Sequence, residues 1–62
     1  MMGIRKIIEL YKRDLARAKR ASDTQKISLV YKKIASTYAS EQQWEKALEY
    51  YVMSIELDEK LG

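Results

Sequence analysis

The chain has 62 residues and a net charge of +3, and it contains neither cysteine nor histidine. This length allows one small domain, which buries only about 60% of the surface that its unfolded form exposes. The missing side chains exclude disulfides, thiolate-bound metals and the commonest general base. We therefore predict a fold that depends on apolar packing, and a protein that is not an enzyme, with no catalytic residue, metal or cofactor.

The charges are divided unevenly along the chain. Residues 1–33 contain ten Lys or Arg and three Asp or Glu, which gives +7, whereas residues 34–62 contain two and six, which gives −4. Such a division is typical of surfaces that bind nucleic acid or membranes, and equally of helices that attract one another within or between chains. We favour attraction between helices, with nucleic acid or an acidic membrane surface as the alternative.

No run of apolar residues approaches the ~20 residues that a membrane span requires. The first ten residues include Arg5, Lys6 and Glu9 and are too charged for the apolar part of a signal peptide. Proline is absent, and the two glycines, Gly3 and Gly62, lie near the ends, which favours uninterrupted helices. These features predict an intracellular, cytoplasmic protein of the all-α class.

Apolar residues in the first third of the chain recur at the three- and four-residue spacings of one helical face. They are Ile4, Ile7, Ile8, Tyr11, Leu15 and Ala18. Basic residues fall mostly off this face, so the pattern predicts a helix over about residues 3–21. Ser22 and Gln25, three residues apart, then predict a capping box at the start of the next helix.

A second and a third helix are predicted over about residues 24–40 and 43–60. The second has the apolar residues Ile27, Val30, Tyr31, Ile34, Ala35 and Tyr38, and in the third Ala47, Leu48, Tyr51 and Ile55 are expected to pack inward. Ser40 with Gln43 offers another capping box, but a helix start at Trp44 suits the apolar pattern better. Since both connections are short, neighbouring helices must be antiparallel. We predict one domain over residues 1–62, an all-α antiparallel array of three helices.

The spacing of aromatic and small residues across the last two helices is more specific. Tyr31-x-x-Ile34-Ala35-x-x-Tyr38 is followed by Trp44-x-x-Ala47-x-x-x-Tyr51-x-x-Ser54. This pattern resembles the tetratricopeptide repeat (TPR), a helix–turn–helix motif, over about residues 28–61. The resemblance implies a TPR-like hairpin over residues 24–60, in which small residues let two helices approach closely.

The chain departs from the family pattern at three positions. Ala35 replaces the usual glycine, Gln42 stands where a turn glycine is common, and Glu59 stands where a closing proline is usual. A shift of forty residues aligns Lys6–Tyr11 with Lys46–Tyr51, so residues 3–21 resemble the second half of a preceding repeat. The alternative is that two amphipathic helices share a period by chance.

Two surfaces are predicted to bind protein. By the resemblance, the residues that line the peptide groove of a TPR array correspond to Leu29, Lys32, Lys33, Ser36 and Ala39. Lys32 matches a lysine that clamps a peptide's terminal carboxylate, whereas Ser36 replaces the asparagine of that clamp. The alternative is that Lys32 and Lys33 are ordinary solubilising charges.

The second surface is the side of the third helix that no following helix covers. We assign to it Trp44, Tyr50, Met53 and Leu57. Because repeat arrays usually need about three repeats and this chain has one and a half, we predict a homodimer or higher oligomer built through this surface. The alternative is a marginally stable monomer. Together these features predict a protein–protein interaction or scaffold module that binds a protein or peptide partner and associates with itself.

Overall fold

A computed structural model describes residues 3–62 and contains the three predicted helices. They are α1 (Ile4–Arg20), α2 (Thr24–Ser40) and α3 (Trp44–Leu61), and these residues include no strand. The prediction of an all-α, three-helix array is confirmed.

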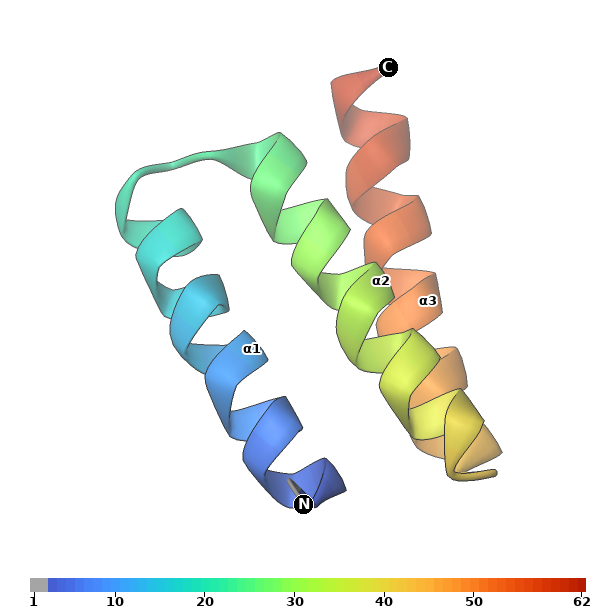
Figure 1. The fold of residues 1–62 in the computed structure, drawn as a ribbon. Helices are drawn as coiled ribbons and strands as arrows, with labels where there is room; N and C mark the ends of the chain where they lie inside the picture. Colours follow the sequence, from blue (N-terminus) through green and yellow to red (C-terminus); the bar gives the residue numbers. More distant parts are fainter. Residues whose placement is uncertain (1–2) are drawn as a thin grey trace.

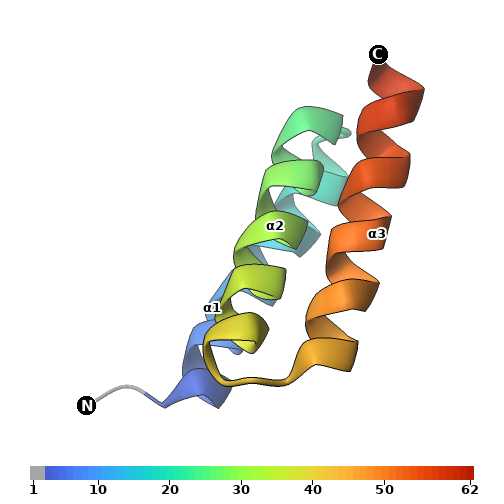
Figure 2. The same ribbon diagram turned by 90° about the vertical axis from the view of Figure 1, so that its right-hand side faces the viewer.

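The helix α2 lies between α1 and α3 and runs antiparallel to both of them (Figures 1 and 2). It packs against each, whereas no Cα atom of α1 comes within 8 Å of one in α3. The outer helices are therefore parallel to each other, and α2 is the element on which the fold is assembled.

The two turns share one backbone geometry. Ser22 and Gln42 have positive φ angles of 54° and 62°. The next residues, Asp23 and Gln43, each donate a backbone N–H to the carbonyl five residues earlier, at 2.9 Å. These bonds define a Schellman motif, which closes one helix at the residue that starts the next. Gln42 thus has the left-handed backbone conformation that glycine adopts most readily.

The predicted capping box of Ser22 and Gln25 is wrong. Asp23 is the N-cap of α2, and its side chain accepts a hydrogen bond from the backbone N–H of Lys26 at 3.2 Å. Ser22 does not cap α2 because it belongs to the turn that closes α1, where the Schellman motif requires the left-handed conformation.

The second capping box is also not formed. The Ser40 hydroxyl donates to the Thr37 carbonyl at 2.7 Å, inside α2. Helix α3 begins at Trp44, as the apolar pattern favoured, and its N-cap residue Gln43 makes no side-chain capping bond.

The core lies along the two contacts of α2. Its buried apolar residues are Ile8, Ala18, Val30, Ile34, Ala35 and Ala47. Half-buried side chains pack against this cluster, namely Ile4, Tyr11, Leu15, Tyr38 and Tyr50. Ile34 is fully buried and is the largest apolar side chain without exposed surface, so it forms the centre of the core.

The inward face of α3 differs from the prediction. Leu48, Tyr51 and Ile55 were expected in the core, yet all three are exposed, Leu48 by 63% and Ile55 by 53%. Ala47 and Ser54 are buried instead. The helix has two neighbouring apolar faces, and the face with the smaller residues packs on α2 because small side chains allow the closer approach. The face with the larger residues is left outside.

Candidate functional site

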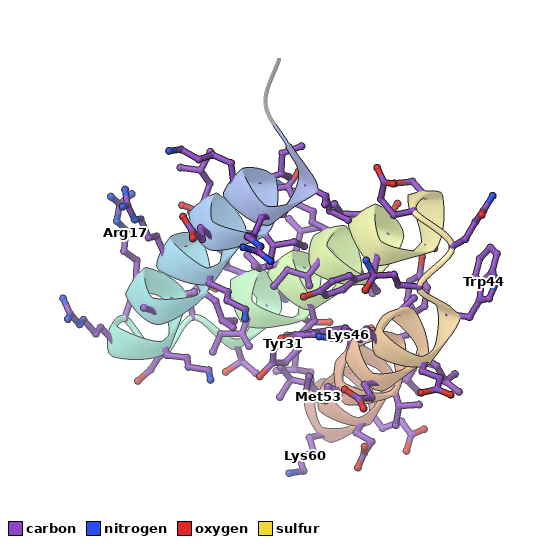
Figure 3. The ribbon with its side chains drawn as sticks, turned by 90° about the horizontal axis from the view of Figure 1, so that it is seen from below. Arg17, Tyr31, Trp44, Lys46, Met53 and Lys60 are labelled. Carbon is purple, nitrogen blue, oxygen red and sulfur yellow. The ribbon has the colours of Figure 1, made fainter. Side chains whose placement is uncertain are left out.

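Helix α3 presents a continuous apolar face that the rest of residues 3–62 does not cover. We call this face the outer stripe; it consists of Trp44, Leu48, Tyr51, Val52 and Ile55. The spacings of three and four residues place these side chains on one side of the helix. Trp44 is 64% exposed and projects away from the other two helices (Figure 3).

One flank of the outer stripe is acidic. Glu45 and Glu49 line a shallow hollow of about 640 Å³ together with Leu48 and Val52 of the stripe. Helical spacing places Glu56 on the same flank as Glu49, seven residues further on. The stripe therefore combines apolar contact area with a row of negative charge.

The outer stripe repeats the face by which α1 packs on α2. At a shift of forty residues Trp44, Leu48, Tyr51 and Ile55 align with Ile4, Ile8, Tyr11 and Leu15. The α1 residues pack in the core, where Ile8 is only 6% exposed. Aligned positions thus carry side chains of similar character, one set covered by α2 and the other uncovered. The stripe has the composition of a helix-packing surface.

The four residues predicted for self-association do not share one face. Trp44 belongs to the outer stripe, but Tyr50 points the other way, with its ring centroid 6.0 Å from that of Tyr31 and 5.9 Å from that of Tyr38. Leu57 is half-buried, and Met53 lies on the side of α3 toward α1 (Figure 3). The prediction missed the other four stripe residues, although the forty-residue alignment contained the signal for three of them.

The predicted peptide groove lies along α2. Leu29 is 50% exposed, Lys32, Lys33 and Ser36 are exposed as well, and Ala39 is half-buried. Their exposure leaves this side of α2 open to a partner.

Lys32 already has a partner within the chain. Its ammonium lies 2.9 Å from the carboxylate of Asp58 on α3, which also accepts a hydrogen bond from the Ser28 hydroxyl at 2.5 Å. The Ser28 hydrogen bond, and secondly Lys32, hold the pKa of Asp58 below its ordinary value. This polar cluster joins α2 to α3 and competes with any peptide carboxylate for Lys32.

Asp58→Asn should lower the midpoint of thermal unfolding at neutral pH. It should also make this midpoint fall less steeply as the pH is lowered. The pKa of Asp58 is lower in the folded protein than in the unfolded one. The stabilisation that its carboxylate provides is therefore complete above about pH 4, and it is lost as the pH falls through the folded pKa. The difference between the two proteins should therefore shrink below pH 4, measured by circular dichroism from pH 7 to pH 2. Glu59→Gln, at an exposed neighbour, is the control. A difference that is constant with pH would contradict this role of Asp58.

A second surface lies between α1 and α3, where α2 forms the floor; we call it the seam. It contains two hollows of about 460 and 320 Å³, each lined by residues of all three helices. Tyr38 lies in the first hollow and Tyr31 in the second. Figure 3, seen from below, shows Tyr31, Lys46 and Met53 toward the space between the outer helices.

No protein-family model matches the chain, and no curated protein or solved structure matches it. Within residues 3–62 no helix is both long and apolar enough to cross a membrane. The same residues hold no group of three acidic side chains that is arranged to bind a metal ion. The function is accordingly inferred from the exposed surfaces.

Proposed function

We propose that the chain is a protein–protein interaction module, a cytoplasmic scaffold of the TPR type that associates with itself. The observation that carries this proposal is the outer stripe, where five large apolar side chains lie together on one helix and are left uncovered. Contiguous exposed apolar surface on a small protein marks an interaction site, because its burial is the main driving force of association.

The forty-residue repeat supports the same proposal. In α1 the aligned residues are covered by α2, and in repeat architectures each unit buries an apolar face against its neighbour. The open side of α2, with Leu29 and Ser36, is the proposed place for a protein or peptide partner. Nucleic acid or an acidic membrane on the basic surface of α1 is the alternative.

Removing the apolar character of the outer stripe should abolish self-association. We expect the wild-type protein to sediment above its monomer mass of 7.3 kDa at micromolar concentration, and Leu48→Gln/Ile55→Gln to sediment as a monomer with unchanged helix content. Each of these side chains contributes about 1.5–3 kcal/mol when it is fully buried. Trp44 is the only tryptophan and lies in the stripe, so its emission should shift to the blue with concentration in the wild type alone.

Leu29→Gln is the matched control, since Leu29 is 50% exposed but lies on α2 outside the stripe. It should associate as the wild type does. A wild-type protein that stays monomeric, with unfolding independent of concentration, would refute self-association. Recovery of nucleic acid with a steep salt dependence and no protein partner would favour the alternative function.

A further inference from the structure

We propose that the outer stripe of one copy docks into the seam of a second copy, so that the chains associate head to tail. This inference rests on the proposed self-association and adds the surface that receives the stripe. Four features of the structure support it: the charge of the seam, the matching charge beside the stripe, the apolar surface of the seam, and the chemistry of the remaining surfaces.

Both edges of the seam are basic. On α1, Arg5 and Lys12 line the first hollow and Lys19 the second. They are seven residues apart, which places them on one face of the helix at intervals of about 10 Å. On α3, Lys46 and Lys60 line the opposite edge, one at each hollow. Five cations thus border the seam, and Glu9 and Glu56 are the acidic residues that line it.

The flank of the outer stripe has the complementary charge. Glu45 and Glu49 border the stripe near its start, and Glu56 follows seven residues after Glu49. This interval equals the interval between Lys12 and Lys19 on α1. A helix α3 laid along the seam can therefore bring two carboxylates to two ammonium groups at once, which favours both encounter and a fixed register.

The seam also offers apolar surface to the stripe. Ile4 and Ile8 line the first hollow beside Tyr38. Met53 and Leu57 line the second. Apolar side chains from the stripe of another copy would be buried against these residues. This burial supplies the driving force for association, and the charges fix the orientation of the two copies.

The other surfaces of a second copy fit the stripe less well. The free side of α2 presents Leu29 among the polar residues Gln25, Lys33 and Ser36. An antiparallel pairing of two stripes would place the acidic flanks on the same side, where like charges oppose association. The stripe side chains face away from the seam across α3, and the acidic flank lies between the two surfaces, where Glu56 and Met53 border both. Such a contact does not close on itself by a two-fold axis, and the assembly grows with concentration.

Reversal of charge in the seam tests the proposal in the full-length protein. Lys12→Glu/Lys19→Glu should weaken association about tenfold or more, and Glu45→Lys/Glu49→Lys should do the same from the stripe side. Mixing the two variants should restore assembly, because each then presents a charge that complements the other. Sedimentation gives the mass, and Trp44 emission reports burial of the stripe.

The matched control is Lys6→Glu/Arg13→Glu. These residues are exposed on the same helix, also seven apart, and neither lines a hollow of the seam. The control has the same net charge as the seam variant and should associate as the wild type does. If the seam variant also associates normally, the stripe pairs with another surface; head-to-tail docking is then wrong, while self-association stands. A monomeric wild type would overturn both.

Discussion

Replacing Ile34 by alanine is expected to lower the free energy of unfolding by about 2–5 kcal/mol. Ile34 has no exposed surface and lies at the centre of the cluster that joins α1 to α2. The substitution removes three carbons and leaves a cavity that the surrounding helices fill only in part. A domain of this size has a small margin of stability, so the variant should be largely unfolded at 37 °C.

Urea unfolding followed by circular dichroism measures this effect, at a concentration where the wild type is monomeric. Leu29→Ala is the control, because Leu29 lies on the same helix and is half exposed, and its loss should change the free energy by less than about 0.5 kcal/mol. Equal destabilisation by both variants would show that the core is not where the structure places it. If the loss of free energy of unfolding in Ile34→Ala depends on protein concentration, the experiment has measured association and not the stability of the core.

The architecture was predictable from sequence because each helix has a clear apolar period and no internal proline or glycine. The orientation of α3 was not. Its apolar residues cover two neighbouring faces, and a period alone does not say which face packs within the chain. Ala47 and Ser54 decide the question, since small residues permit close approach to α2 and the larger Leu48 and Ile55 do not.

The outer stripe was missed for the same reason. Leu48 and Ile55 were assigned to the core, and so they were not considered as a surface. Tyr50 was assigned to the surface although its ring packs with Tyr31 and Tyr38. The seam could not be predicted, because it depends on how far apart α1 and α3 lie across α2. The seven-residue spacing of Arg5, Lys12 and Lys19 was visible in the sequence. That Lys46 and Lys60 of α3 lie on the opposite edge of the same surface was not.

Introducing glycine into both turns should raise the free energy of unfolding by about 1–2 kcal/mol in total. Ser22 and Gln42 have φ angles of 54° and 62°, a conformation that is costly for residues with a Cβ atom. Glycine adopts it without this strain, and part of the gain is offset by its greater freedom in the unfolded chain. We expect Ser22→Gly/Gln42→Gly to raise the unfolding temperature by roughly 4–16 °C.

The residue just before the first of these glycines provides the control. Ala21 closes α1 with a φ angle of −83°, which alanine adopts freely. Ala21→Gly should therefore lower the free energy of unfolding by about 0.5–1 kcal/mol, although it adds a glycine to the same turn. Opposite signs at adjacent positions would show that the left-handed conformation, rather than turn flexibility, limits stability. Thermal unfolding measures all three proteins, and a destabilised double-glycine variant would mean that the turns do not have the Schellman geometry.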